Sequence, residues 1–151
     1  MAPPLGHMVT RLVQAPADIA LAFLSDPVSL GRWSLGCFGT MLDETSGAHT
    51  GRSLFDGSQG WFSIEVDHPR MIIDYLVGAP DRLSRRISAR VVAGATVGYD
   101  EGSCLVMLSA WRPAEMDDER WEQLCASHEA EIWLIKAQIE TYHRECRGDE
   151  G

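Results

Sequence analysis

His128 is the side chain whose type and position best suit acid–base chemistry. It stands between Cys125 and Ile132, in a series of residues three or four apart that is otherwise mostly apolar. Burial in such a series would displace its pKa and let the imidazole exchange a proton with a neighbouring molecule. The alternative is a core histidine that is hydrogen-bonded to the backbone or to water.

Tyr75 and Arg85 are polar residues in segments of alternating hydrophobicity. Tyr75 shares one face of its segment with Ile73 and Val77, and its hydroxyl would either meet a ligand or belong to a plain core aromatic. Arg85 has the same parity as Ile87, so an inward guanidinium would need an anion such as a ligand carboxylate. The alternative for Arg85 is a solvated position at the end of its segment.

No complete catalytic signature accompanies these residues. The sequence has no nucleophile elbow, no phosphate-binding glycine loop and no dinucleotide-binding glycine fingerprint. It also lacks an HxxxH motif or a clustered pair of carboxylates that would predict a metal site. The four cysteines are widely separated and form neither a metal knuckle nor a redox pair. We therefore predict no metal and no cofactor, and the sequence leaves any catalytic residues unknown.

A long helix near the C-terminus must position His128. Residues 117–146 place apolar side chains three or four apart, which is the spacing of one helix face. Acidic residues at its start and basic residues at its end suit the helix dipole, and Gly148 follows as a stop. The apolar stripe consists of Trp121, Leu124, Cys125, His128, Ile132, Ile135, Ile139 and Tyr142. The solvated face consists of Glu122, Glu129, Lys136, Glu140 and Arg144.

Alternating hydrophobicity predicts strands upstream of that helix. Pro16 and the pair Asp26-Pro27 are suited to begin two short helices after the first strand, and short turns favour antiparallel neighbours among the later strands. The sequence therefore predicts an α+β fold in which a curved antiparallel sheet wraps around the long terminal helix. The predicted strands are residues 8–14, 39–43, 52–56, 61–67, 71–77, 83–92 and 103–111.

Length and charge limit the domain organisation and the classes of partner. The 151 residues predict a single domain, 1–151, with residues 1–7 and 147–151 as flexible tails. A net charge of −9 argues against nucleic acid or an anionic membrane as a partner. No apolar run approaches about 18 residues, so no membrane span is predicted. The first residues lack the features of a signal peptide, and together with the separated cysteines this predicts a cytoplasmic location.

Several short motifs follow one another in an order that is specific as a set. They are residues 9–17 with 19–24, Asp26-Pro27 with Leu30 and Trp33, Gly51, Phe55-Asp56-Gly57, residues 66–70 leading into Tyr75, and the terminal helix. In this order the chain resembles the START-like superfamily, which includes pollen allergens, polyketide cyclases and chaperone-activator homologues with the helix-grip fold. The resemblance covers almost the whole chain and implies an internal cavity for apolar molecules. It fixes no activity, because binders, cyclases and chaperone regulators share that fold.

A ligand pocket between the sheet and the terminal helix is the resulting prediction. The leading hypothesis is a soluble binding protein for a small hydrophobic or aromatic molecule, lipid- or polyketide-like. One alternative is a cyclase or dehydratase that uses His128 as an acid–base group; another is a chaperone-regulator-like interaction protein. A homodimer is compatible with each of these. The residues assigned to the pocket are His128, Tyr75, Arg85, Trp33, Phe62, Ile64, Val66, Ile132 and Ile135.

Overall fold

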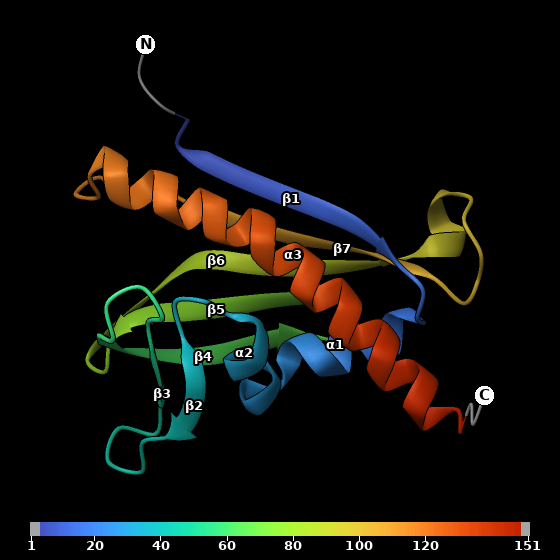
Figure 1. The fold of residues 1–151 in the computed structure, drawn as a ribbon, viewed down its shortest axis with the longest axis horizontal. Helices are drawn as coiled ribbons and strands as arrows, with labels where there is room; N and C mark the ends of the chain where they lie inside the picture. Colours follow the sequence, from blue (N-terminus) through green and yellow to red (C-terminus); the bar gives the residue numbers. More distant parts are fainter. Residues whose placement is uncertain (1–3, 149–151) are drawn as a thin grey trace.

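Seven antiparallel strands form one curved sheet in the computed structural model, which describes residues 4–148. Their order across the sheet is β1-β7-β6-β5-β4-β3-β2, so the chain crosses from one edge to the other between its first two strands (Figure 1). The strands are β1 (Gly6–Val13), β2 (Phe38–Leu42), β3 (His49–Arg52), β4 (Gln59–Asp67), β5 (Ile72–Ala79), β6 (Arg82–Ala93) and β7 (Cys104–Trp111). The predicted α+β architecture is confirmed.

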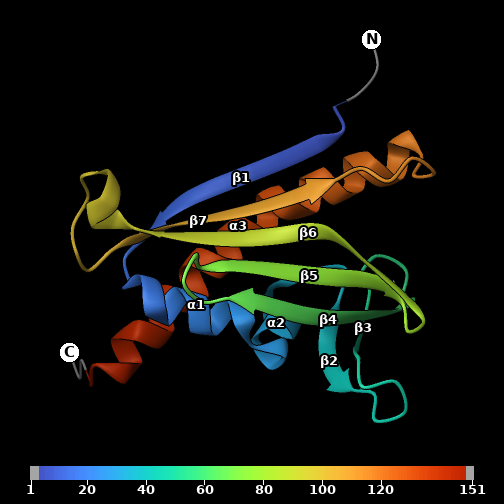
Figure 2. The ribbon, with the colours of Figure 1, turned by 180° about the vertical axis from the view of Figure 1, so that it is seen from behind.

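In the described part of the chain, three α-helices lie against one face of this sheet, and the view from behind shows the other face without a helix (Figure 2). They are α1 (Ala17–Ser25), α2 (Pro27–Trp33) and α3 (Asp118–Cys146), and a short 3₁₀ turn, η1 (Gly94–Val97), precedes β7. Asp26 caps α2 by accepting a hydrogen bond from the Ser29 amide at 3.1 Å, and Asp117 caps α3 through the Arg120 amide at 2.7 Å. Within residues 4–148, no helix has the length and hydropathy needed to cross a membrane.

The segment predicted as a strand over residues 52–56 is mostly a turn. Strand β3 covers His49–Arg52 instead, and the amide of Gly57 donates to the carbonyl of Ser53 at 2.8 Å. Gly57 has a φ of 74°, which glycine adopts without strain and which ends the extended backbone. The exposed Phe55 is therefore carried on a turn between β3 and β4.

The predicted N-terminal tail is too long. Strand β1 begins at Gly6, which pairs with Trp111 of β7, and His7 pairs with Ala110. At the other end, Arg147 and Gly148 form a turn after α3. The remaining tail residues, 1–3 and 149–151, lie outside the described part of the chain.

Strand β2 is an irregular edge of the sheet. Its register with β3 shifts between Phe38 and Met41, and Gly39 within that shift has a φ of 61°. Such a shift inserts an extra residue into the strand and bends it. The exposed apolar side chains of β2 are Phe38, Met41 and Leu42.

The C-terminal half of α3 is held by the main hydrophobic core. Ile132, Ile135 and Ile139 are almost fully buried against α1 and the middle of the sheet. Tyr142 was predicted at the end of the same stripe, but it is 49% exposed. The last turns of α3 run past the strands, so they have no sheet surface to cover (Figure 1).

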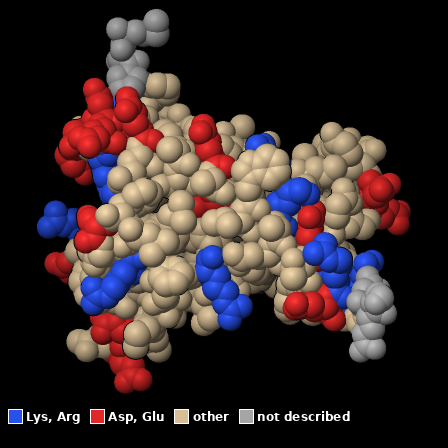
Figure 3. Space-filling model, in the orientation of Figure 1, with Lys and Arg blue, Asp and Glu red and all other residues tan. Residues whose placement is uncertain are grey.

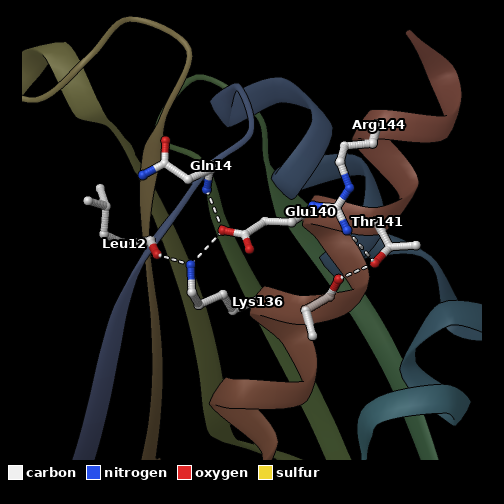
Figure 4. A network of polar contacts seen from close by, with 7 residues as sticks. Leu12, Gln14, Lys136, Glu140, Thr141 and Arg144 are labelled. Atoms are coloured by element: carbon white, nitrogen blue, oxygen red, sulfur yellow. Dashed lines mark hydrogen bonds and ion pairs between the residues drawn. The ribbon is translucent and has the colours of Figure 1, made fainter. Parts of the chain in front are cut away.

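A polar network fastens the same half of α3 to the end of β1 (Figure 4). Glu140 accepts a hydrogen bond from the amide of Gln14 at 2.8 Å and forms an ion pair with Lys136. Lys136 also donates to the carbonyl of Leu12 at 3.1 Å. Both residues were predicted on a solvated face, whereas their side chains are largely covered and satisfy backbone groups of another element.

Helix α2 approaches β2 so closely that only glycine fits at position 31. A Cβ atom on Gly31 would lie 2.7 Å from the backbone nitrogen of Thr40, and the Thr40 hydroxyl donates to the carbonyl of Pro27 at 2.6 Å. Replacing glycine by alanine in an exposed helix stabilises it by about 1 kcal/mol. For Gly31→Ala we expect the opposite, a loss of about 1–3 kcal/mol from overpacking, measured by chemical denaturation.

Gly36→Ala is the matched control for this substitution. A Cβ added at Gly36 meets no atom within 4 Å, so we expect little change in the denaturation midpoint. A Gly31→Ala protein as stable as the wild type would contradict the close approach of α2 and β2.

Candidate functional site

A pocket of about 300 Å³ lies between α2, the N-terminal half of α3 and strands β4, β5 and β6. Phe62 and Tyr75 in its wall are almost fully buried, whereas Phe55 and Arg120 at its border are exposed. The pocket therefore runs from solvent into the fold. Its aromatic and aliphatic lining residues are Leu30, Trp33, Phe55, Trp61, Phe62, Tyr75, Val77, Ile87 and Leu124.

The pocket takes up only one end of the space between the sheet and α3. At the other end, Ala20, Leu21 and Leu24 of α1 pack against the sheet and against α3 in the main core. The boundary between the pocket and the main core falls within α3. Its residues that line the pocket all lie between Arg120 and Glu131, and its three buried isoleucines follow from position 132 onward.

Of the nine residues assigned to the pocket from the sequence, four line it: Trp33, Phe62, Tyr75 and His128. Ile132 and Ile135 are instead buried in the core, and Ile64 and Val66 are half-buried side chains packed against that core. Their assignment to the pocket is wrong because α1 fills the end of the concave face that they cover. Their inward orientation was predicted correctly.

Tyr75 contributes its ring to the pocket, whereas its hydroxyl is used by the fold. The hydroxyl donates to the carbonyl of Leu24 at 2.6 Å, and the ring meets Trp33 edge to face at 5.9 Å between centroids. Burial, together with the nearby charge of Glu131, raises the pKa of Tyr75. The phenol is therefore protonated at any physiological pH and serves as an aromatic wall.

The prediction that Arg85 points into the pocket is wrong, and Arg86 lines the pocket instead. Leu76 pairs with Arg85 while Tyr75 pairs with Ile87, so β6 carries one extra residue at this point. This bulge breaks the alternation of side chains along the strand. Arg85 is left on the outer face, 57% exposed and paired with Glu65, and the neighbouring Arg86 lines the pocket.

His128 and Glu131 place two buried ionisable groups beside each other on α3. His128 is 5% exposed and Glu131 is 3% exposed, and the His128 Nε2 atom lies 4.0 Å from the Glu131 Oε1 atom. The other carboxylate oxygen of Glu131 accepts a hydrogen bond from the Leu35 amide at 2.9 Å, which ties α3 to the end of α2.

The surroundings of this pair push the two pKa values in opposite directions. Burial raises the pKa of Glu131 to about 7, against the hydrogen bonds from Leu35 and Ser34. Burial, with smaller effects of the neighbouring His7 and of the Arg86 charge, lowers the pKa of His128 to about 4. Near neutral pH the imidazole is therefore neutral, and the Glu131 carboxyl is close to its titration midpoint, where it can give or accept a proton.

Glu131 is a second site residue, besides Arg86, that the sequence reasoning missed. The signal was present, because Glu131 stands three residues after His128 and four before Ile135, on the predicted apolar stripe. A glutamate in a long surface helix is usually solvated, so its position on the stripe was not taken as evidence that it is buried.

Three residues that line the pocket have buried polar atoms without a hydrogen-bond partner among residues 4–148. The atoms are Trp33 Nε1, His128 Nδ1 and Arg86 Nη1. A buried donor without a partner costs free energy that a ligand acceptor could recover. The site is therefore apolar over most of its wall and polar at a few defined atoms, the usual composition of a small-molecule site.

Neither nucleophilic thiol chemistry nor a metal centre is indicated in the described chain. Cys37 lines the pocket, but burial, with the charge of Glu131, raises the pKa of its thiol to about 11, so the reactive thiolate is scarce. Across residues 4–148, His, Cys, Asp and Glu side chains do not gather in groups of three or more that could hold a metal ion. The absence of a cofactor stays a prediction.

Charged side chains surround this side of the molecule without forming one basic surface (Figure 3). Acidic residues gather over the start of α3, where Glu115, Asp117, Asp118 and Glu119 are exposed. On the face shown, basic residues are dispersed among acidic ones. The exclusion of nucleic acid as a partner stays a prediction from the net charge.

Comparison with known proteins identifies the fold. No family model matches the sequence, and no curated protein matches it. Among solved structures, the Zhui aromatase/cyclase from a Streptomyces species superposes with a TM-score of 0.63 and 17% identity, over 97% of this chain and 98% of that one. A START superfamily protein from Mycobacterium smegmatis gives 0.60 and 14%, over 93% and 98%.

A third likeness is to the Aha1 dimer from Colwellia psychrerythraea, with a TM-score of 0.63 and 12% identity, over 91% of this chain and 97% of that one. At these identities the likenesses show the fold alone. The helix-grip fold that the sequence predicted through its START-like resemblance is confirmed, and the function must be argued from the pocket.

Proposed function

We propose that this chain, which has the fold of START superfamily proteins, binds a small aromatic molecule in the pocket beneath the N-terminal half of α3. The observation that carries the proposal is a pocket whose aromatic wall includes buried polar atoms without protein partners. Apolar burial would supply most of the affinity. The Trp33 Nε1 donor would select ligands that bear a hydrogen-bond acceptor, and His128 Nδ1 would donate to or accept from a polar group of the ligand according to its tautomer.

The size of the pocket favours a compact ligand. About 300 Å³ is at the lower end of the range of about 300–1,000 Å³ that is usual for small-molecule sites. A molecule of two or three fused or linked rings matches this volume better than a long-chain lipid does. The rings of Trp33 and Phe62 offer it flat surfaces.

Glu131 supports a second candidate, a cyclase or dehydratase that acts on a polyketide-like substrate in the same pocket. Such reactions move a proton between carbon and oxygen, and a carboxyl with a pKa of about 7 is suited to transfer it. His128, neutral at this pH, would donate a hydrogen bond to the substrate oxygen or accept one from a substrate hydroxyl. In this candidate Glu131 takes the acid–base role that the sequence analysis gave to His128.

Filling the pocket should abolish ligand binding. Leu124 of α3 lines the pocket, and we expect Leu124→Trp to fill it and to reduce binding of the neutral fluorescent probe N-phenylnaphthylamine by about tenfold or more, since apolar contact area is lost. Fluorescence titration measures the affinity. The matched control is Leu134→Trp on the same helix, where the native side chain is 38% exposed and outside the pocket.

Equal binding of the probe by both variants would count against this pocket as the ligand site. Native mass spectrometry of the freshly purified protein, followed by organic extraction, would then identify whatever molecule co-purifies with the chain. Turnover of polyketide-like substrates by the wild type but not by Glu131→Gln would favour the enzymatic candidate.

A further inference from the structure

Arg86 is a cation placed in an otherwise largely apolar pocket without a counter-ion. Its side chain lines the pocket and its Nη1 atom is buried without a hydrogen-bond partner. Among residues 4–148, every ion pair within 4.0 Å joins other residues. The guanidinium therefore bears the cost of leaving water without the return that a carboxylate would give.

A second cation, Arg120, lies near Arg86. Arg120 lines the same pocket from α3, and burial together with the charge of Arg120 lowers the pKa of Arg86. The charge of Glu115 acts to raise the pKa of Arg86. Glu115 is exposed, however, and forms no ion pair with Arg86. Arg86 and Arg120 thus place two cations at the pocket, in a chain whose net charge is −9.

Glu131 also lines the pocket, but no ion pair within 4.0 Å joins it to Arg86. Its charge acts on Cys37 and Tyr75, whereas the charge of Arg86 acts on His128. The main influences on Glu131 are its burial and its hydrogen bonds from residues after α2, with no contribution from Arg86 among them. Among residues 4–148, Arg86 therefore has no carboxylate within ion-pair distance, and the buried Glu131 carboxyl lies beside His128 instead.

We infer that the ligand is an aromatic acid whose anionic group binds Arg86, with its rings between Trp33 and Phe62. The inference rests on the proposed function and adds the charge of the ligand to it. A planar guanidinium binds a carboxylate or sulfonate through two parallel N–H donors, so the anion would satisfy Nη1 and neutralise the buried charge together. For folding alone, an apolar residue at this position would serve as well or better.

Two probes with the same ring system separate charge from apolar burial. Anilinonaphthalene sulfonate carries an anion, and N-phenylnaphthylamine is its neutral counterpart. We expect the wild type to bind the sulfonate about tenfold or more tightly than the neutral probe, as a charge-assisted hydrogen bond allows. In Arg86→Met this preference should disappear while the neutral probe still binds. Arg85→Met, the neighbouring outward arginine, should keep the preference.

Each result of these titrations supports or overturns a defined statement. A sulfonate preference that persists in Arg86→Met, or that disappears equally in Arg85→Met, overturns the role of Arg86. Binding of the neutral probe without any preference in the wild type overturns the acidic ligand but leaves the proposed function standing. Failure of the wild type to bind either probe removes the proposed function itself.

Folding of the variants is checked by their denaturation midpoints. Because Arg86→Met removes a half-buried charge that has no ion-pair partner among residues 4–148, we expect its midpoint to be no lower than that of the wild type. If this variant nevertheless unfolds, Arg86→Lys answers the same question. It keeps the charge but loses the forked donor geometry, and it should retain only part of the preference for the sulfonate.

Discussion

Ile135→Ala is expected to lower the free energy of unfolding by about 2–5 kcal/mol, the usual loss when a buried isoleucine is truncated. Ile135 of α3 is fully buried in the core that α3 forms with α1 and the sheet, in the part of the concave face that has no pocket. The neighbouring side chains belong to three different elements, so they cannot easily close the cavity that the substitution leaves. Chemical denaturation of the purified variant measures the change.

Leu134→Ala is the control for the buried position. The Leu134 side chain is 38% exposed on the other face of the same helix, and alanine is the better helix former. We expect a change within about 0.5 kcal/mol. Equal destabilisation by the two substitutions would contradict the orientation of α3.

The second large effect concerns the pH dependence of stability, in which Glu131 and His128 should oppose each other. The pKa of Glu131 rises from 4.5 to about 7 on folding, so its contribution is most favourable below pH 4.5 and is lost as the pH rises through 7. The pKa of His128 falls from 6.5 to about 4, so its contribution is lost as the pH falls from 6.5 through 4. Each is on the order of 3 kcal/mol at full extent.

Single substitutions should expose the two opposing contributions. In the wild type they largely cancel between about pH 4.5 and pH 6.5. We expect the stability of Glu131→Gln to rise across this interval, because only His128 remains, and that of His128→Asn to fall, because only Glu131 remains. Denaturant titrations at a series of pH values measure these slopes.

Other carboxyl groups affect the pH dependence of stability equally in the wild type and in both variants. Hydrogen bonds to Ser46, Ser58 and Arg70 lower the pKa values of Asp43, Asp56 and Asp67, respectively. Their contributions are present above pH 3.8 and are lost as the pH falls, and they are common to all three proteins. Parallel stability curves for the wild type and both variants would contradict the buried pair.

Regular patterns made most of the fold predictable from the sequence. The apolar stripe of α3 identified its buried face. Asp26 marked the start of α2 because its side chain can accept a free amide, and acidic residues that suit the helix dipole marked the start of α3. Alternation placed Phe62 and Ile73 inward, where the structure has them. These signals are local, so one sequence is enough to read them.

The parts of the site that were mispredicted depend on information that is not local. Whether Arg85 or Arg86 faces inward is decided by one extra residue in β6, which appears only when β6 pairs with β5. Whether Ile132 lines a pocket or a core depends on where α1 packs, since both environments are apolar. Glu131 was overlooked for a different reason: its residue type is common on solvated helix faces.

The irregular edge at β2 has a consequence for the protein in concentrated solution. An outer strand with exposed apolar residues such as Phe38, Met41 and Leu42 is a ready template for an added strand from another molecule, which is how many β-sheet proteins begin to aggregate. The register shift and the left-handed Gly39 interrupt the row of backbone donors and acceptors along this edge. A second copy therefore finds only a short run of aligned groups at β2, which disfavours edge-to-edge pairing along this side of the sheet.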